Sequence, residues 1–101
     1  MILVFVSTEN KKDAGKLANH LIDLHMAACV SIIPVESFYF WKGEKVHYNE
    51  CELIIKTKVE KFSAIEKAIS DVLPYEIPQI ISINAKDANS SYLKWLEEAV
   101  R

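Results

Sequence analysis

The sequence predicts an α+β domain in which two β-α-β units share one antiparallel sheet. Apolar residues follow strand spacing in four segments and helical spacing in the segments between and after them, giving the order β-α-β, β-α-β, α. The segments at 3–8 and 53–57 resemble each other, which indicates two similar halves. Because crossover connections are right-handed, both central helices are expected on one face of a four-stranded sheet, the ferredoxin-like arrangement.

The first half begins with an apolar run over residues 2–7, which is typical of a strand that is covered on both faces. Helical spacing then takes over and predicts an amphipathic helix over residues 10–26, with Thr8 or Asn10 as its cap. Its apolar stripe consists of Ala14, Leu17, Ala18, Leu21, Leu24 and Ala28.

A long β-hairpin is predicted next. Residues 29–41 are rich in β-branched and aromatic side chains, Lys42-Gly43-Glu44 interrupts them, and residues 46–57 resume as a strand. Pro34 must mark a bulge or an edge strand, because proline cannot donate a hydrogen bond to a neighbouring strand.

The second half repeats the pattern of the first. A capping-box pattern at residues 57–60 precedes a helix that Pro74 should end at about Val72. Residues 77–83 read as the fourth strand, and a third helix is expected to begin at Asn89-Ser90.

Composition favours one folded domain, residues 1–101, in a reducing cytoplasmic setting. The 101 residues carry 12 Lys and Arg against 14 Asp and Glu, and Arg101 is the only arginine, which argues against nucleic-acid binding. Two cysteines are too few for a secreted disulfide scaffold, and no apolar run is long enough for a membrane span.

The hairpin is too long for a chain of this size to cover. Each arm of roughly 12 residues spans about 40 Å, whereas a domain of this length has a radius of gyration near 13 Å. The outer half should therefore project and dock on neighbouring copies in a closed homo-oligomer. The expected contact residues are Phe38, Tyr39, Phe40, Trp41, Val46 and Tyr48.

The hairpin also holds the candidate metal ligands Glu36, His47 and Glu50. With the loop centred on Gly43, Glu36 is expected opposite Glu50 and His47 opposite Tyr39. Two opposed carboxylates need a cation, a proton or a partner chain between them. A lysine of a partner chain is the common way to neutralise such a pair. The more specific alternative is an interchain metal site that uses Glu36, His47 or Glu50.

The same register bears on the two cysteines. It places Cys29 opposite Thr57 and Cys51 opposite Val35, so the two thiols are not expected to be neighbours within one chain. Buried core cysteines are the expected description.

Five motifs in order give the chain a specific resemblance. They are Ala27-Ala28-Cys29-Val30-Ser31-Ile32-Ile33-Pro34, Tyr39-Phe40-Trp41-Lys42-Gly43, Ile55-Lys56-Thr57, Pro74-Tyr75-Glu76-Ile77-Pro78 and Tyr92-Leu93-Lys94-Trp95-Leu96. Together they resemble the CutA divalent-cation tolerance family over essentially the whole chain. The resemblance implies a ferredoxin-like domain assembled as a tight trimer, related in architecture to the PII signalling proteins.

The resemblance also implies a role in divalent metal tolerance or response, without enzymatic activity and with copper binding in some members. The copper ligands of some bacterial members are a cysteine at the end of the first strand and two histidines before the Pro-Tyr motif. At the matching positions this chain has Val6, Val72 and Leu73, which cannot bind a metal. Copper or another divalent cation would therefore need other ligands here.

A cleft between subunits, as in trimeric relatives, is the other site that the resemblance implies. Its candidate residues are Lys56, Tyr75, Glu76 and Trp95, which combine apolar bodies with polar tips. The structural alternative is that Tyr75 anchors a proline turn and Trp95 packs the last helix.

The leading hypothesis is a non-enzymatic homotrimer of metal tolerance or response. The alternative is a PII-like sensor that binds a small molecule or anion at subunit interfaces. Two glycines cannot build a glycine-rich phosphate loop, and no nucleophile with a base can be placed, which disfavours nucleotide binding and catalysis.

Overall fold

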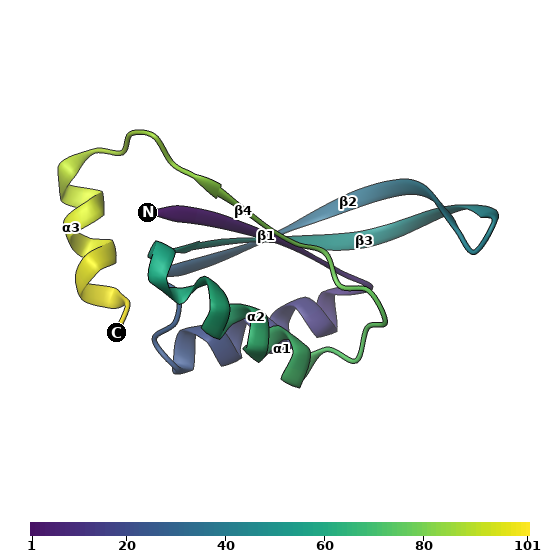
Figure 1. The fold of residues 1–101 in the computed structure, drawn as a ribbon, viewed down its shortest axis with the longest axis horizontal. Coiled ribbons are helices and arrows are strands. Elements are labelled where there is room, and N and C mark those ends of the chain that lie inside the picture. The colour runs from purple at the N-terminus through teal and green to yellow at the C-terminus, as the bar shows by residue number, and fades with distance from the viewer.

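A computed structural model describes all residues 1–101, and it confirms the α+β fold with four strands and three α-helices (Figure 1). The elements, in chain order, are β1 (Ile2–Thr8), α1 (Lys11–Asp23), β2 (Cys29–Trp41), β3 (Glu44–Thr57), a 3₁₀ turn (Val59–Lys61), α2 (Phe62–Val72), β4 (Ile80–Asn84) and α3 (Ser90–Ala99).

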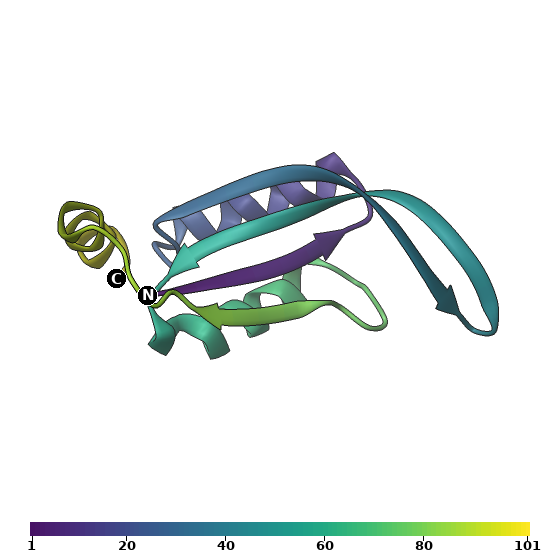
Figure 2. The same ribbon diagram turned by 90° about the horizontal axis from the view of Figure 1, so that it is seen from above.

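The sheet has the order β2-β3-β1-β4, with every neighbouring pair antiparallel. Helices α1 and α2 lie side by side against one face, as the right-handed crossovers require (Figures 1 and 2). β2 is an edge strand, and Pro34 lies within it opposite Cys51. The edge position expected for this proline is therefore confirmed.

The core lies between the sheet and these two helices. In β1, alternate residues are buried, and the buried ones face the helices. The largest side chains that are fully enclosed there are Val4, Val6, Leu17, Leu21, Leu53, Ile55, Ile65 and Ile69. Two buried hydroxyls are satisfied, because Thr57 donates to the Met26 carbonyl at 2.7 Å and Thr8 to the Cys51 carbonyl at 3.0 Å. The helix-facing side therefore carries the packing energy of the domain.

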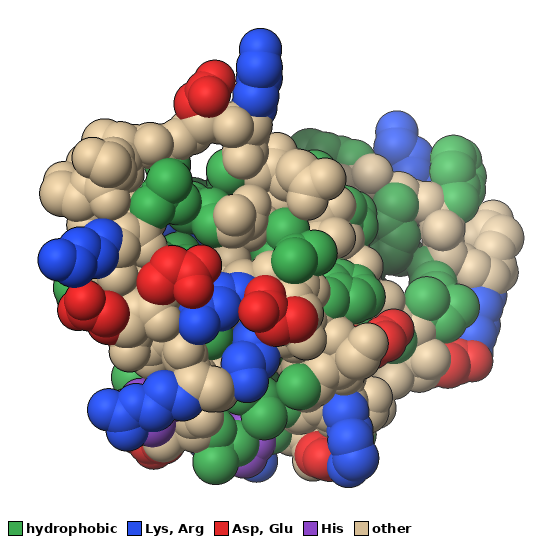
Figure 3. Space-filling model, turned by 60° about the vertical axis from the view of Figure 1, so that its left-hand side comes forward, with side chains coloured by type: hydrophobic (Ala, Val, Ile, Leu, Met, Phe, Trp, Pro, Cys, Tyr) green, Lys and Arg blue, Asp and Glu red, His purple; other side chains and the backbone are tan.

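The opposite face of the sheet has no helix across it. Leu3 and Phe5 in β1 pair with Ile83 and Ile81 in β4, and Ile54 in β3 lies opposite Phe5, so these apolar side chains share one face. The side chains of Ile81 and Ile83 are 51% and 48% exposed. In Figure 3, hydrophobic side chains reach the surface across the middle of the molecule and again on the ribbon. The apolar run of β1 is thus covered on one face only in a single chain.

The outer parts of β2 and β3 project as a curved two-stranded ribbon (Figure 2). The molecule measures 46 × 26 × 20 Å, and its long axis runs along this ribbon (Figure 1). At the tip, Lys42 and Gly43 have φ angles of +51° and +83°. Positive φ at both central residues is the signature of a type I′ turn, whose twist matches that of a hairpin.

The hairpin register differs by one residue from the one expected. Trp41 pairs with Glu44, so the turn is centred between Lys42 and Gly43 rather than on Gly43. Glu36 consequently faces Asn49 instead of Glu50, and His47 faces Phe38 instead of Tyr39. The expected opposition of two carboxylates was therefore wrong.

The two cysteines shift with the same register. Cys29 faces Lys56 and Cys51 faces Pro34, rather than Thr57 and Val35. Both thiols are free and half-buried, and they lie at different places along the hairpin, as expected. The expectation that they are buried core residues holds only in part.

The helices follow the sequence with small shifts at their ends. Asn10 caps α1, where its Oδ1 accepts from the Asp13 amide at 2.8 Å. The capping box expected at residues 57–60 is not formed, because the Thr57 hydroxyl bonds to Met26 and a 3₁₀ turn precedes α2. β4 begins at Ile80 rather than at residue 77.

Helix α3 stands at the end of the sheet away from the ribbon (Figure 1). Leu96 and Val100 bury their side chains against the domain, and the Arg101 amide donates to the His25 carbonyl at 2.9 Å. Lys58 pairs with Glu97 at 3.2 Å across the same boundary. Figure 1 marks both chain termini at this end of the molecule, away from the ribbon.

Candidate functional site

The ribbon presents large aromatic side chains to solvent. Phe38 is 64% and Phe40 73% exposed, and Tyr39 and Tyr48 are also exposed. Tyr39 and Tyr48 contact each other at a ring-centroid distance of 6.1 Å. Alternation along β2 places Phe38 and Phe40 on one face and Tyr39 and Trp41 on the other. Aromatic side chains on both faces of a two-stranded ribbon are typical of a surface that another chain covers.

One predicted pair of metal ligands comes together on the ribbon. His47 Nε2 lies 2.9 Å from Glu36 Oε2, since these residues are diagonal neighbours on one face. The His47 ring stacks on Phe38 with centroids 4.1 Å apart and an interplanar angle of 8°. Phe38 and Glu36 thus hold the imidazole in one orientation.

Glu50 does not face this pair. It lies opposite Val35, and the alternation of the strand points it to the other face from His47. Glu36 and Glu50 both border a shallow depression of about 360 Å³ beside Pro34. No three His, Cys, Asp or Glu side chains of one chain lie close enough together to hold a metal ion.

A single chain therefore does not fit a divalent cation by itself. Glu36 and His47 supply one carboxylate and one imidazole, which leaves further ligands to come from a second copy or from water. Val6, Val72 and Leu73, the positions at which the resemblance led us to look for copper ligands, have no donor atom in their side chains, and they lie in the core or pack against it.

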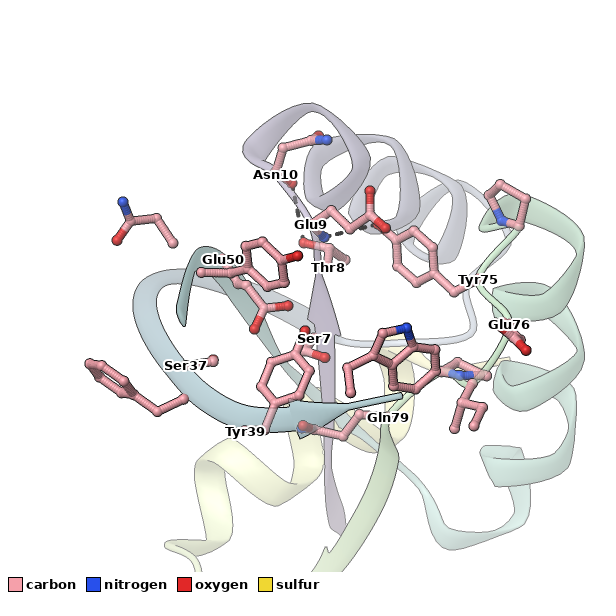
Figure 4. Close-up of a pocket in the computed structure, with 17 residues that line it drawn as sticks. Ser7, Thr8, Glu9, Asn10, Ser37, Tyr39, Glu50, Tyr75, Glu76 and Gln79 are labelled. Carbon is pink, nitrogen blue, oxygen red and sulfur yellow. Dashed lines mark hydrogen bonds between the residues drawn. The ribbon is translucent and has the colours of Figure 1, made fainter. Parts of the chain in front are cut away.

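A hollow of about 1110 Å³ lies at the base of the ribbon, between its inner curve and the loop that joins α2 to β4 (Figure 4). The end of β1, the ribbon and the loop each contribute to its wall. The lining residues are Ser7, Thr8, Glu9, Asn10, Ser37, Phe38, Tyr39, Trp41, Tyr48, Asn49, Glu50, Pro74, Tyr75, Glu76, Ile77, Pro78 and Gln79. Of these, the sequence predicted Phe38, Tyr39, Trp41 and Tyr48 as trimer contacts, Glu50 as a metal ligand, and Tyr75 and Glu76 as cleft residues.

Tyr75 fixes one side of this hollow. Its hydroxyl donates to Asp13 Oδ2 at 2.6 Å and accepts from the Glu9 amide at 2.9 Å. The loop is thereby tied to the start of α1, as Figure 4 shows for Tyr75 and Glu9. Burial and then the hydrogen bond to Asp13 raise the pKa of Tyr75 above its usual range. The anchoring role foreseen for Tyr75 matches these contacts.

Negative charge dominates the hollow. Its wall includes Glu9, Glu50 and Glu76 and has no Lys, Arg or His, although Lys42 pairs with Glu76 from outside at 3.5 Å. Loss of hydration and then the Glu50 carboxylate raise the pKa of Tyr39, with smaller effects of Tyr48 and Glu9. The Glu50 carboxylate therefore contributes a negative electrostatic potential at the Tyr39 hydroxyl.

Glu52 lies just beyond the hollow, on the open face of the sheet. Its Oε1 accepts from Gln79 Nε2 at 2.6 Å. Burial raises the pKa of Glu52, the Gln79 bond lowers it, and nearby Glu50 raises it. Glu52 and Gln79 were missed from sequence, because nothing in the local pattern marks two residues 27 positions apart as partners.

The four residues expected in a subunit cleft fall into two groups. Tyr75 and Glu76 line the hollow, whereas Lys56 and Trp95 lie at the α3 end of the sheet. There the Lys56 ammonium is 5.9 Å from the centre of the Tyr92 ring, and Tyr92 contacts Trp95 at 5.4 Å. One chain thus does not bring the four together, and a cleft that contains them must join two chains.

The chain is similar to known proteins over almost its whole length. The model of a family described as CutA1 divalent ion tolerance protein matches residues 2–99. The chain is 32% identical to the divalent-cation tolerance protein CutA of Thermus thermophilus, over 95% of this chain and 94% of that protein. It is 36% identical to the chloroplastic CutA 1 of Oryza sativa, over 99% of this chain, which spans 57% of the rice protein, and 37% identical to the CutA homolog of Xenopus laevis, of which it spans 64%.

Solved structures share the fold. The crystal structure of CutA1 from Pyrococcus horikoshii superposes with a TM-score of 0.96 at 32% identity, covering 100% of this chain and 99% of that one. CutA1 from Oryza sativa gives 0.95 at 36% identity, covering 99% and 93%. None of the helices here has the length and apolar character needed to cross a membrane.

Proposed function

Because the chain belongs to the CutA1 divalent ion tolerance protein family, we propose that it acts as a non-enzymatic homotrimer in divalent metal tolerance or response. The family is named for ion tolerance rather than for a reaction, and the proposed cargo is copper or another divalent cation. The observation that carries the proposal is the aromatic ribbon with Glu36 and His47 on one face.

Two apolar surfaces support the assembly. The ribbon residues Phe38, Tyr39, Phe40 and Tyr48 are exposed in one chain, and so are Ile81 and Ile83 on the open sheet face. Burial of apolar surface stabilises by roughly 25 cal/mol per Å². A closed ring of three copies removes these surfaces from water without leaving a free interface. Trp41 and Val46, which are half-buried already, belong to the same proposed contact.

The proposed metal site is an interchain one. Glu36 and His47 of one copy supply two ligands 2.9 Å apart, so a metal that enters between them displaces their mutual hydrogen bond. Glu50 faces the other side of the ribbon, so it contributes to a neighbour's site rather than to that of its own chain. In the proposed trimer, Glu36 and His47 of one chain therefore lie close to Glu50 of a neighbouring chain.

Calorimetric titration with Cu²⁺ and Zn²⁺ tests the metal site. We expect His47→Asn and Glu36→Gln to weaken binding at least tenfold and Glu50→Gln to weaken it as well. Glu98→Gln on α3 is the matched control and should bind as the wild type does. An isotherm unchanged by all three ribbon substitutions would exclude these residues as ligands.

The PII-like alternative, a sensor of a small anion at subunit interfaces, has weaker support. The part of the hollow that one chain supplies carries Glu9, Glu50 and Glu76 and no cationic side chain, so by itself it repels anions. Lys56 and Lys58 at the α3 end are already engaged with Tyr92 and Glu97. Thermal-shift screening with metals and with nucleotides separates the two functions, since a ligand at 100 times its Kd adds about 2.7 kcal/mol.

A cytoplasmic location is part of the proposal. Two free thiols, Cys29 and Cys51, suit a reducing compartment. Relatives differ in this respect, because the rice protein is named chloroplastic and the Archaeoglobus fulgidus structure is described as periplasmic. Cell fractionation with an antibody to the chain settles the compartment.

A further inference from the structure

Three side chains on one face of the ribbon form an ordered cluster. Phe38 lies directly opposite His47 in the hairpin register, and the imidazole lies flat on the phenyl ring, with centroids 4.1 Å apart and an interplanar angle of 8°. Glu36 precedes Phe38 by two residues, which places it on the same face, and its Oε2 is 2.9 Å from His47 Nε2. The imidazole is therefore held at its face by Phe38 and at its edge by Glu36.

The two contacts differ in what happens to them when a metal binds. A metal ion between Glu36 and His47 takes the place of their hydrogen bond, since it uses the carboxylate and Nε2. The stack on Phe38 uses the face of the imidazole and neither of its nitrogens, so it is compatible with the metal-free and the metal-bound protein. Glu36 and His47 are 65% and 51% exposed, so the rest of the chain restricts their side chains little. Phe38 is therefore the contact that can fix the ring throughout.

We propose that Phe38 is a positioning residue of the metal site, because its ring holds the His47 imidazole with Nε2 directed toward Glu36. This inference rests on the proposed metal function and concerns how the two donors are arranged. A ligand that is oriented before binding loses less conformational freedom when the metal arrives, and groups that orient a metal-binding histidine contribute to affinity. Loss of the Phe38 ring should therefore weaken metal binding although no donor atom is removed.

Phe40 provides a matched comparison. It lies on the same face two residues along β2, is exposed as Phe38 is, and belongs to the same proposed subunit contact. It lies opposite Lys45, and no aromatic or histidine ring is stacked on it. Stacking occupies one face of the Phe38 ring and leaves the other for a neighbouring chain. A comparison of the two phenylalanines therefore separates the stack from the subunit contact.

NMR of the metal-free protein measures the orientation of His47. Protons of an imidazole that lies over a phenyl ring resonate upfield because of the ring current. We expect the His47 ring protons, assigned with His47→Asn, to lie upfield of those of the exposed His25. They should move downfield in Phe38→Leu, stay upfield in Phe38→Tyr, and move less in Phe40→Leu than in Phe38→Leu.

Calorimetric titration with Zn²⁺ measures the effect on the site. An aromatic contact can change an equilibrium constant severalfold, so we expect Phe38→Leu to weaken binding at least about threefold more than Phe40→Leu does. Phe38→Tyr keeps the flat ring and should bind within about twofold of the wild type. Light scattering on the same samples gives the mass at which the variants are compared. If Phe38→Leu alone changes the mass, Phe38→Met takes its place, because methionine fills similar space without a flat ring.

Three results would overturn the inference. One is a set of His47 resonances that Phe38→Leu does not move, which indicates that the ring is not held by the stack. Another is equal weakening of Zn²⁺ binding by Phe38→Leu and Phe40→Leu, which assigns the effect to the subunit contact. The third is binding in Phe38→Leu as tight as in the wild type while His47→Asn loses it, which leaves the metal site intact and contradicts only the positioning role.

Failure of the metal proposal gives a different pattern. In that case the wild type does not bind Zn²⁺, or His47→Asn and Glu36→Gln bind it as the wild type does. The positioning role then fails together with the metal site, even where the His47 resonances show the stack.

Discussion

Tyr75 is the residue that most directly joins the loop of the hollow to the helical layer. Its hydroxyl has two partners, the Asp13 carboxylate and the Glu9 amide, both at the start of α1. A phenol that donates to a carboxylate is neutral, so ionisation of Tyr75 would place two negative charges 2.6 Å apart. The contact between the loop and α1 therefore requires the protonated form of Tyr75.

Tyr75→Phe removes that hydroxyl and leaves the ring. We expect a loss of about 1–3 kcal/mol in the free energy of unfolding, because a hydrogen bond to a charged group is lost and the Glu9 amide loses its acceptor. Urea denaturation at fixed chain concentration measures it. Tyr92→Phe is the control, since the Tyr92 hydroxyl makes no hydrogen bond within the chain, and an equal loss in both variants would contradict a stabilising role for the Tyr75 hydroxyl.

The same contact predicts how the free energy of unfolding changes at alkaline pH. The pKa of Tyr75 is raised in the folded chain, so its contribution is intact below about pH 10, the ordinary tyrosine value, and is lost as pH rises toward the folded value. The wild type should therefore lose more stability than Tyr75→Phe when urea denaturation is repeated above pH 10.

For individual residues, the sequence predicted which side chains could bind a metal better than it predicted which of them lie close together. Glu36, His47 and Glu50 were chosen for their donor atoms, and Glu36 and His47 do meet. Their geometry was missed because a one-residue error in the turn centre moves every residue of one strand to the other face. The φ angles of Lys42 and Gly43 decide that centre, and a single glycine in the sequence leaves open which position of the turn it occupies.

The ribbon is the element that depends most on one short turn. Gly43 adopts a φ of +83°, which is available to glycine at little cost. Lys42 adopts +51° in the αL region, where a side chain is tolerated with some strain. The two strands of the ribbon are therefore aligned by a turn whose second residue tolerates few substitutions.

The two glycines of the chain provide a matched pair of substitutions. Gly43→Ala should cost about 1–2 kcal/mol because alanine is strained at positive φ. Gly15→Ala in α1 should instead gain up to about 1 kcal/mol, since no atom lies within 4 Å of the new Cβ and alanine favours a helix. Thermal denaturation of the two variants checks this, and a shift of the same sign in both would contradict it.

Among the elements, long patterns were predicted well and short local signals were not. Both helices of the sandwich and the hairpin follow from periodicity over ten or more residues. The capping box at Thr57 failed because a buried hydroxyl found a better partner in the Met26 carbonyl. A local sequence pattern cannot predict a hydrogen bond between residues as far apart in the chain as Thr57 and Met26.

For the whole molecule, exposed apolar surface predicts association. Phe40 is the most exposed aromatic of the ribbon at 73%, so its side chain adds little to the stability of one chain. Burying a phenylalanine against a partner contributes about 1.5–3 kcal/mol. Association should therefore be more sensitive to Phe40 than the fold is.

Phe40→Ser tests this difference. We expect light scattering to show a shift from three chains toward one chain of 11.5 kDa, while circular dichroism keeps the αβ spectrum. Val59→Ser is the control, because Val59 is 64% exposed but lies in the 3₁₀ turn that follows the end of β3 opposite to the ribbon tip. A wild-type protein that is already a single chain at micromolar concentration would contradict the trimer.

The edge position of Pro34 has a consequence for how such a molecule assembles. A sheet with two open edges and an apolar face is able to add copies without end and grow into a filament. Proline has no amide hydrogen to offer an incoming strand, so β2 cannot form an uninterrupted ladder with another chain along its length. Growth by continuous edge pairing is therefore blocked at the middle of β2, and ring closure is favoured over polymerisation.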